Sequence, residues 1–284
     1  MLTPGLYLVS CPIGNQLDIT LRALSVLKEV DVIAAEDTRV AGRLLTDYDI
    51  KAGGRLISCH EHNENQRSRE LLERLQTGQT VALITDAGTP AVSDPGFRLV
   101  QAAIDNQIRV LPVPGVSAAV TALSASGLPS DAFVFAGFLP RKSGKRQQRL
   151  EELAGHKETI VLYESPRRIR QTLEEVLRCW GDRRAVVGRE MTKTYEEFLR
   201  GRLSELLPLL AERDRVRGEI TLVVAGADEA PPSFSSRDIE TAVRESSDST
   251  ARLAKKLAAS YGVSRQWVYD EIIRLRQSEP DDPG

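Results

Sequence analysis

Short apolar runs alternate with amphipathic stretches throughout residues 5–225, and this alternation limits the fold more than any other feature of the chain. Apolar runs of about four to eight residues between turn-forming residues are typical of buried strands, and apolar side chains three or four apart are typical of helices. In the first half we expect strands over Leu6–Ser10, Val32–Ala35, Val81–Thr85 and Arg109–Val113, and helices over Asp18–Val30 and Glu64–Gln76. Such alternation predicts an α/β fold with a mostly parallel sheet covered by helices on both faces.

The alternation starts again after Leu128 and Pro129. Here we expect strands over Ala132–Ala136, Thr159–Tyr163, Ala185–Arg189 and Glu219–Val224, and helices over Ile169–Trp180 and Leu203–Leu210. The restart predicts two α/β lobes, residues 1–113 and 114–228, with their boundary near Pro112–Gly115.

The last part of the chain has a different pattern. Residues 228–236, DEAPPSFSS, are rich in proline and serine and predict a linker. Residues 237–278 contain no strand-like run and form two apolar-striped helices separated by Gly262 and Ser264. Glycine can end the first helix in a left-handed conformation, and serine can cap the second. This order predicts an all-α helix-turn-helix module, although helical hairpins that bind nothing share the pattern.

The composition is that of an ordinary globular protein, with 41% hydrophobic and 27% charged residues. Its three cysteines, Cys11, Cys59 and Cys179, are unevenly spaced, which is typical of reduced thiols rather than of a disulfide framework. No apolar run approaches the ~20 residues that cross a bilayer, and the N-terminus lacks the basic start of a signal peptide. We therefore expect a cytoplasmic protein without a membrane partner.

Positive charge is concentrated in the predicted second lobe. Residues 1–135 carry 11 basic and 15 acidic side chains, whereas residues 136–202 carry 16 and 10. The densest cluster has five cations within nine residues and no acid: Arg141, Lys142, Lys145, Arg146 and Arg149. Because Gly137 and Gly144 lie in the same stretch, we expect a mobile loop that binds RNA phosphates, although such runs are often only solvated faces.

Four turn-rich segments follow predicted strands. They are Cys11–Asn15, Asp86–Gly96, Pro112–Ala118 and Tyr163–Arg168. Glycine and proline let the main chain turn sharply and approach a ligand closely, and open α/β sheets bind ligands beyond the carboxyl ends of their strands. Four such segments predict a shared pocket, whereas a single one would be read as a tight connection.

Several common kinds of site are missing from these segments. No GxGxxG follows the first strand and no GxxxxGK[ST] occurs, which argues against dinucleotide and nucleoside-triphosphate sites. His60 and His62 are two residues apart with no further ligand nearby, so we expect no metal. No Ser–His–Asp or Cys–His set is visible. Cys11 in the first turn is a possible nucleophile, but a small buried side chain is the better interpretation.

Together these turns resemble one family. The strings SCPIGNQLDIT, AAEDTR, CHEHNE, TDAGTPAVSDPG, PVPGVSAAVTALSASG, YESPRR and REMTKTYEE occur in this order within residues 5–225. They resemble the bacterial 16S rRNA (cytidine-2′-O)-methyltransferases of the tetrapyrrole-methylase superfamily, and the terminal helical module resembles that family's extra domain. The resemblance implies a two-lobed class III methyltransferase fold, a homodimer, and S-adenosylmethionine held in the cleft between the lobes.

The resemblance also implies which residues contact the cofactor. Carried over by position, they come from the first three turns and from the second lobe: Pro12, Ile13, Gly14, Gly88, Thr89, Val92, Ser117, Ala118, Tyr163, Met191 and Ile220. Thr89 stands where other branches of the superfamily carry aspartate, which favours the RNA branch. Cys11 and Arg167 depart from the threonine and histidine of many relatives, so no role of a ring nitrogen is carried over at the second position.

The implied reaction methylates a cytidine ribose in the decoding region of 16S rRNA, with the small ribosomal subunit as partner. A ribose hydroxyl has a high pKa, so the reaction needs alignment and a group that takes or orients the hydroxyl proton. The candidates are Glu36, Asp37 and Glu164, although a helix cap or loop hydrogen bond is the commoner use of such residues. Further phosphate contacts are expected from Arg39, Arg167 and Lys193.

Two other functions fit parts of the sequence. A methyltransferase for a small, tetrapyrrole-like molecule would keep the cofactor pocket but would not need the basic cluster or the terminal module. A helix-turn-helix regulator whose α/β body senses a ligand would bind a nucleic-acid duplex sequence-specifically and transfer no methyl group. Neutralising the five cations distinguishes the first alternative, and an assay for methyl transfer distinguishes the second.

Overall fold

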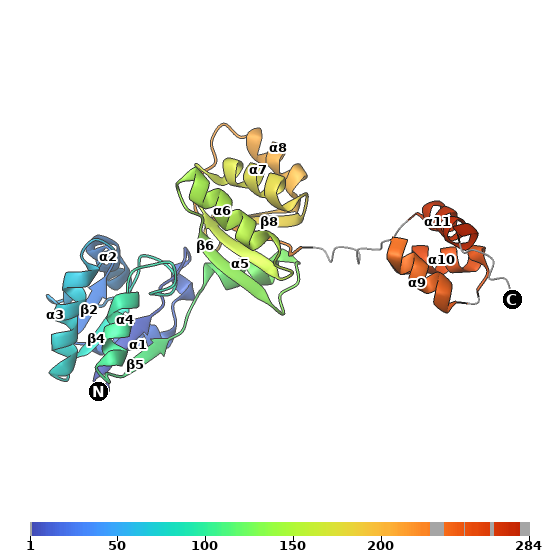
Figure 1. The fold of residues 1–284 in the computed structure, drawn as a ribbon. Coiled ribbons are helices and arrows are strands. Elements are labelled where there is room, and N and C mark those ends of the chain that lie inside the picture. The colour runs from blue at the N-terminus through green and yellow to red at the C-terminus, as the bar shows by residue number, and fades with distance from the viewer. Residues whose placement is uncertain (1, 228–235, 247, 262–263, 279–284) are drawn as a thin grey trace. The chain divides into compact units, whose positions relative to one another are not determined.

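A computed structural model describes residues 2–227, 236–246, 248–261 and 264–278. It divides into two compact units, residues 1–226 and 227–284 (Figure 1). Residues 228–235 of the predicted linker and Gly262 of the predicted turn lie outside the described residues.

The first unit begins with a five-stranded parallel sheet. Its strands are β1 (Gly5–Val9), β2 (Val32–Ala35), β3 (Leu56–Ser58), β4 (Thr80–Ile84) and β5 (Val110–Val113), in the order β3-β2-β4-β1-β5. The helices between them are η1 (Gln16–Asp18), α1 (Leu21–Glu29), α2 (Thr38–Asp47), α3 (Glu64–Gln76) and α4 (Phe97–Asp105). The parallel sheet expected for the first half of the chain is confirmed.

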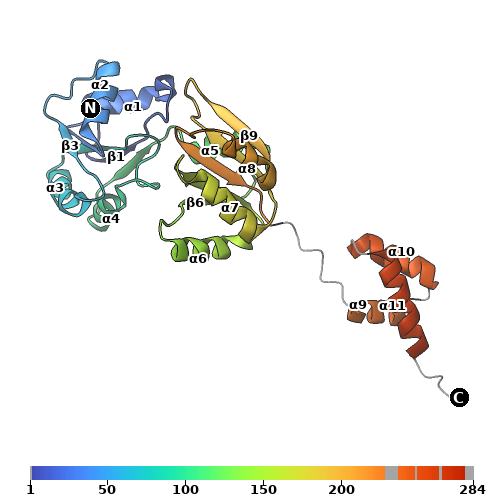
Figure 2. The ribbon, with the colours of Figure 1, turned by 90° about the horizontal axis from the view of Figure 1, so that it is seen from above.

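Both faces of this sheet are buried because successive side chains of a strand point to opposite sides. Ile33 of β2 belongs to a core cluster with residues of α1 and α2, whereas its neighbour Val32 belongs to a second cluster with residues of α3 and α4. All four residues of β2 and all five of β4 are buried. Figure 2 shows the helices lying on the two sides of the sheet. Burial on both faces explains why these strands are continuous apolar runs.

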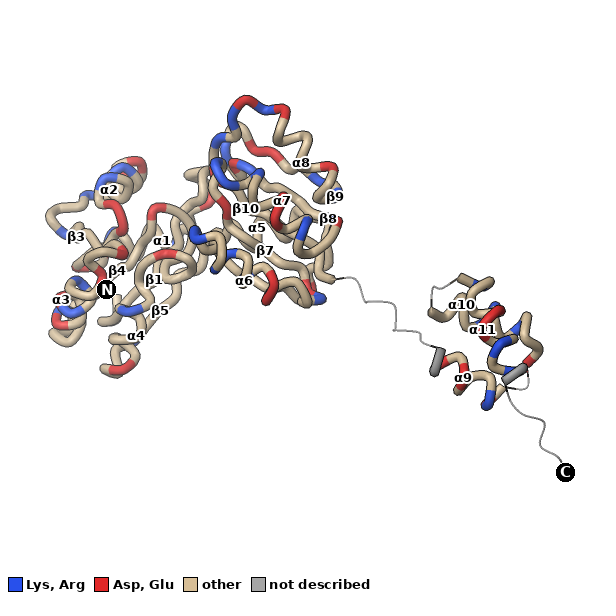
Figure 3. The backbone as a smooth tube through the Cα atoms, turned by 45° about the horizontal axis from the view of Figure 1, so that its top comes forward, with Lys and Arg blue, Asp and Glu red and all other residues tan. Residues whose placement is uncertain are grey.

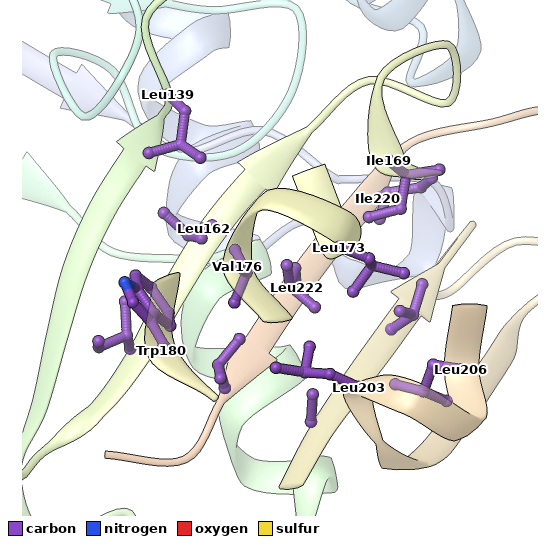
Figure 4. Close-up of a cluster of buried hydrophobic side chains, with 14 of the residues drawn as sticks. Leu139, Leu162, Ile169, Leu173, Val176, Trp180, Leu203, Leu206, Ile220 and Leu222 are labelled. Carbon is purple, nitrogen blue, oxygen red and sulfur yellow. The ribbon is translucent and has the colours of Figure 1, made fainter. Parts of the chain in front are cut away.

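A second five-stranded sheet follows in the same unit. Its strands are β6 (Phe133–Phe138), β7 (Thr159–Glu164), β8 (Arg184–Arg189), β9 (Glu197–Arg202) and β10 (Ile220–Val224), in the order β6-β7-β10-β8-β9. The helices are α5 (Ala118–Ser126), α6 (Ser143–Ala154), α7 (Ile169–Trp180) and α8 (Leu203–Ala211). The core between the sheet and the last three of these helices includes Trp180, Leu173 and Leu206, as Figure 4 shows.

The direction of the strands in the second sheet corrects the expectation of a mostly parallel sheet. Only β6 and β7 are parallel, and the other three pairings are antiparallel. An apolar run does not indicate the direction of a strand. Strand β8 joins β9 through the short segment 190–196 without a crossover helix, so this pair is antiparallel. However, β6, β7 and β8 run in the same direction, so their carboxyl ends lie at one edge of the sheet together with the start of β10.

The second unit is a three-helix module. It consists of α9 (Ser236–Glu245), α10 (Thr250–Tyr261) and α11 (Arg265–Ser278). The helices share a small core that includes Ile239, Leu253 and Ile272. The Ser264 hydroxyl accepts a hydrogen bond from the Trp267 N–H at 3.4 Å, which is the cap expected from the sequence. Among the described residues, no helix has the length and apolar character that a membrane crossing requires.

Candidate active site

The turns after β1 and β4 are joined directly. Cys11 and Gly88 exchange two backbone hydrogen bonds of 2.8 and 3.1 Å. The hydroxyls of Ser10 and Thr89 lie 3.2 Å apart. Two segments that are far apart in the sequence are thereby held at the carboxyl edge of the first sheet, where open α/β sheets bind ligands.

The turn after β5 joins the same group. The Ser10 N–H donates to the Val113 carbonyl at 3.2 Å, and the Thr89 hydroxyl donates to the Val116 carbonyl at 3.4 Å. Gly115 passes so close to β1 that an added Cβ would lie 2.8 Å from the Ser10 Cβ. Only glycine permits this approach, so the three turns converge as the sequence predicts.

The long turn of residues 86–96 is held at its carboxyl end by Glu64 of α3. The buried Glu64 carboxylate accepts hydrogen bonds from the Gly96 and Arg98 N–H groups, each at 3.0 Å. Ala91 and Ser93 both have φ of 64°, a left-handed conformation that costs free energy in residues other than glycine. Such strain persists only where the surrounding structure imposes it, and the hydrogen bonds of Glu64 supply part of that support.

The second sheet meets these turns from the other side. The Asn15 N–H donates to the Thr192 hydroxyl at 2.9 Å. Gly137 in β6 has φ of +61°, and an added Cβ would lie 3.0 Å from the Ser93 Oγ. Residues of both sheets therefore come into contact within one compact unit.

A cavity of about 330 Å³ lies between the turns and the second sheet. Its lining includes nine of the eleven residues assigned to the cofactor by resemblance: Ile13, Gly88, Thr89, Val92, Ser117, Ala118, Tyr163, Met191 and Ile220. The other two, Pro12 and Gly14, line a neighbouring hollow that shares Ile13 and Glu219 with the cavity. The cavity is near the lower end of the ~300–1,000 Å³ typical of small-molecule sites.

The cavity wall combines apolar side chains with aromatic rings. Tyr163 and Phe138 meet edge to face with their ring centroids 5.6 Å apart, and Phe135 supports Tyr163 from a distance of 4.9 Å. Burial raises the pKa of the Tyr163 hydroxyl, so this side chain stays neutral. Phe138 lines the cavity although 59% of the residue is exposed, so it lies at the mouth. The sequence interpretation did not select Phe138, because the strand was expected to end at Ala136 and no motif included Phe138.

Asp94 and Glu219 are acidic residues of the cavity wall that the sequence interpretation missed. Burial raises the pKa of Asp94 to about 7, and the nearby carboxylates of Glu36, Asp86 and Glu219 add to the effect. No hydrogen bond or ion pair of the Asp94 side chain occurs within the described part of the chain. The SDPG string did contain Asp94, but a turn-forming role for aspartate hides a chemical one.

The three carboxylates predicted as candidate proton acceptors differ in their surroundings. Asp37 caps α2 through the Arg39 N–H at 2.8 Å, and the Arg39 guanidinium holds the pKa of Asp37 well below its usual range. Glu164 is buried and accepts hydrogen bonds from Thr172 and Arg168, at 2.6 and 3.0 Å. Both therefore have the structural contacts of a cap or loop residue. Burial and Asp86 raise the pKa of Glu36, which leaves Glu36 as the freest of the three.

The structure corrects the expectation of a mobile basic loop, because most of this stretch is helical. Residues 143–154 form helix α6, so Lys145, Arg146 and Arg149 lie on a helix, and Gly144 is in its first turn. Arg146 is buried and makes a bidentate ion pair with Glu175 of α7, at 2.5 and 2.7 Å. This burial and this ion pair, which joins α6 to α7, argue against the expected contact of Arg146 with RNA. The run of cations concealed the helix, since its apolar face is only Leu150 and Leu153.

The remaining predicted phosphate ligands fall into two groups. Arg141, Lys142, Lys145 and Arg167 are exposed near the carboxyl ends of β6 and β7, and Figure 3 shows basic positions at the start of α6. The others are paired with carboxylates: Arg39 with Asp37, Arg149 with Glu152, and Lys193 with Glu190 and Glu219. Lys193 in particular lies between two carboxylates at 2.8 and 2.9 Å, which lowers its suitability for phosphate.

The thiol of Cys11 and the histidines give no sign of chemistry. Burial raises the pKa of Cys11 to about 12, so the thiolate required of a nucleophile is not accessible near neutral pH. His60 and His62 lie with their rings 5.9 Å apart. In the described segments no group of three or more His, Cys, Asp or Glu side chains could hold a metal ion.

The sequence is similar to one protein family over most of the first unit. A family model described as tetrapyrrole (corrin/porphyrin) methylases matches residues 5–207. Proteins named ribosomal RNA small subunit methyltransferase I are similar over nearly the whole chain. The protein from Mesorhizobium japonicum is 46% identical over 100% of this chain and 96% of its own length. That from Micromonospora olivasterospora is 47% identical over 94% and 86%.

Solved structures of similar fold are more distant in sequence. The uroporphyrin-III C-methyl transferase from Thermus thermophilus, complexed with S-adenyl homocysteine, has a TM-score of 0.55 at 24% identity, covering 78% of this chain and 97% of its own. A cobalt precorrin-4 methyltransferase of cobalamin biosynthesis has a TM-score of 0.57 at 21% identity, covering 78% and 94%. At these identities the likeness shows the fold of the first unit.

Proposed function

Because the chain belongs to the tetrapyrrole (corrin/porphyrin) methylase family, and within it to the ribosomal RNA small subunit methyltransferases I, we propose that it methylates the 2′-hydroxyl of a cytidine ribose in the decoding region of 16S rRNA. The chain is an enzyme of the methyltransferase class, and its cofactor is S-adenosylmethionine. The observation that carries the proposal is the cavity at which the turns of the first sheet meet the second sheet.

The lining of the cavity fits this cofactor. Apolar side chains such as Ile13, Val92 and Met191 suit the adenine and the methionine chain, and the tight turn at Gly88 brings backbone polar groups to the wall. The acidic side of the cavity, with Asp94, suits the positive charge of a sulfonium and an ammonium group. When bound, S-adenosylmethionine supplies a methyl group on a sulfonium sulfur, which is already a good leaving group.

The chain must therefore align the ribose hydroxyl and accept its proton. We assign the proton either to Asp94, which lies in the cavity wall, or to its neighbour Glu36, which does not line the cavity. Asp94 has the stronger case, because it lies in the cavity wall and its carboxylate has no partner among the described residues. Asp37 and Glu164 are better explained by the contacts that they make within the fold.

RNA is held in this proposal by the exposed cations near the cavity mouth. Arg141, Lys142, Lys145 and Arg167 offer charge to phosphates without a competing carboxylate partner in the described structure. Because four exposed cations supply few contacts, we propose the small ribosomal subunit in the cytoplasm as the substrate. A homodimer, implied by the resemblance, has an exposed apolar surface available at Leu17 and Leu21, which are 88% and 86% exposed.

The proposal is tested by mapping the transferred methyl group. Small ribosomal subunits lacking the modification are incubated with the protein and methyl-labelled S-adenosylmethionine, and the RNA is digested to nucleosides. We expect the label on a 2′-O-methylcytidine from the decoding region. Label in a base would contradict the proposed chemistry, and label in an added tetrapyrrole with none in the RNA would favour the small-molecule alternative.

A further inference from the structure

A second hollow, which we call the arginine cleft, lies at the same edge of the second sheet as the cavity. It has a volume of about 400 Å³ and is lined by four arginines, a tyrosine, a glutamate and a valine: Arg189, Arg213, Arg215, Arg217, Tyr195, Glu190 and Val216. These residues come from the end of β8, from the segment 190–196 between β8 and β9, and from the segment before β10. Because β10 lies between β7 and β8, and the segment before β10 contributes to both linings, the cavity and the cleft are neighbours along the sheet edge.

The charges of the cleft are only partly neutralised from within the fold. Glu197 accepts hydrogen bonds from Arg189 at 2.9 Å and from Arg213 at 2.6 and 2.8 Å, so a single carboxylate holds two guanidinium groups. Arg215 and Arg217 are exposed and form no ion pair among the described residues. Asp214 lies between Arg213 and Arg215 in the sequence but does not line the cleft. An anion in the cleft would therefore meet fixed and free guanidinium groups together.

The walls of the cleft are fixed to those of the cavity. Glu190 makes two hydrogen bonds to the backbone of Glu219. The Glu190 N–H donates to the Glu219 carbonyl at 3.0 Å, and the Glu190 carboxylate accepts from the Glu219 N–H at 2.9 Å. Glu190 and Arg217 line the cleft, whereas the residues that follow them, Met191 and Gly218, line the cavity. For a ligand that occupies both hollows, the part in the cleft would thus be held in a fixed position relative to the part in the cavity.

We propose that the arginine cleft binds backbone phosphates of the RNA strand next to the target nucleotide, and that Tyr195 stacks on an unpaired base of that strand. Tyr195 is 73% exposed beside the guanidinium groups, an arrangement suited to single-stranded RNA. The cleft and the exposed cations of Arg141 and Lys142 lie on opposite sides of the cavity, so one strand would cross the cavity mouth between them. This inference rests on the proposed function.

The test measures the binding of fluorescein-labelled single-stranded RNA 12-mers, oligo(C) and oligo(U), to the full chain by anisotropy. The variant Arg215→Gln/Arg217→Gln is compared with Arg178→Gln/Arg184→Gln, which removes the same charge from exposed positions at the opposite edge of the sheet. We expect the first variant to weaken both 12-mers about tenfold and the second to change them less than twofold. The slope of log Kd against log salt should fall by about 1.4, at ~0.7 for each lost phosphate contact.

Tyr195 gives a second readout that charge alone would not move. Tyr195→Ala should weaken both 12-mers about fivefold, and Tyr195→Phe, which keeps the ring, should restore binding. Equal effects of the two double variants, or no measurable binding by the unaltered protein, would overturn the proposal. The outcome is separate from that of the proposed function, since the 12-mers are not methylated in this assay and the unaltered protein is tested on small subunits independently.

Discussion

At the scale of single residues, the site depends on an aspartate whose environment opposes its charge. Asp94 is surrounded by Glu36 from the end of β2, Asp86 from the end of β4, Glu219 before β10 and Tyr163 from β7. Three like charges and burial together raise the pKa of Asp94 to about 7. A group with this pKa can accept a proton near neutral pH and release it again, which is what a general base requires.

The first prediction concerns Asp94→Asn. Since the carboxylate must be ionised to accept the proton, kcat of the unaltered protein should rise with pH through about 7 and level off above it. The variant should lose about 100-fold in kcat and should show no rise near pH 7. The measurement is a pH profile of methyl transfer to small subunits. Asp105→Asn, at the exposed end of α4, is the control, and an unchanged profile in Asp94→Asn would argue for Glu36 as the acceptor.

The same residue should weaken the fold at high pH. Because the folded pKa of Asp94 is raised above its unfolded value, the folded protein binds more protons between the two values, and stability falls as pH rises through this window. Asp94→Asn should therefore unfold at a higher urea concentration than the unaltered protein at pH 8, with the difference vanishing near pH 3.

At the scale of elements, most strands could be predicted from the sequence, whereas helix α6 could not. Alternation of apolar runs located eight of the ten strands, because burial on both faces makes a strand a continuous apolar run. Strands β3 and β9 were not predicted, because β3 has only three half-buried residues and β9 carries charged residues among its apolar ones. Helix α6 was not predicted either, because the cations of residues 143–154 were interpreted as an RNA-binding loop. In the structure one of these cations, Arg146, is buried in an ion pair with Glu175.

The second prediction tests the role of Arg146. Arg146→Ala leaves the largely buried Glu175 carboxylate without its partner and should lower the free energy of unfolding by about 3 kcal/mol. Arg149→Ala removes an exposed ion pair on the same helix and should cost less than about 1 kcal/mol. The measurement is urea unfolding, followed by RNA binding at a concentration where both variants are folded. A loss of RNA affinity in Arg146→Ala without a loss of stability would contradict the assignment.

The third prediction concerns the long turn of residues 86–96. Glu64→Ala removes the acceptor of two backbone N–H groups, so the strained conformations at Ala91 and Ser93 should relax and the cavity wall should lose its shape. We expect the Kd for S-adenosylmethionine to rise about tenfold and stability to fall by about 2 kcal/mol. Calorimetry measures the first quantity, and Glu64→Gln, which keeps an acceptor oxygen, should largely restore it. If Glu64→Ala left cofactor binding unchanged, the conformation of the turn would not depend on the hydrogen bonds of Glu64.

At the scale of the whole molecule, the error in strand direction did not spoil the site. The sequence interpretation assumed parallel strands, and only the first sheet obeys this throughout. The turns nevertheless converge, because β6, β7 and β8 share one direction and so present their carboxyl ends at a single edge. The sequence could not indicate which side chains lack partners. Asp94 and Arg215 form no ion pair among the described residues, and this depends on which residues surround them in the folded chain.

The central claim is that the turns of the first sheet and the edge of the second enclose one cofactor. Crystals of the full chain soaked with S-adenosylhomocysteine test it directly. The account predicts density for the compound in the cavity, against Ile13 and Val92 on one side and Met191 and Ile220 on the other. Density bound elsewhere, or turns so far apart that side chains fill the space between them, would contradict it.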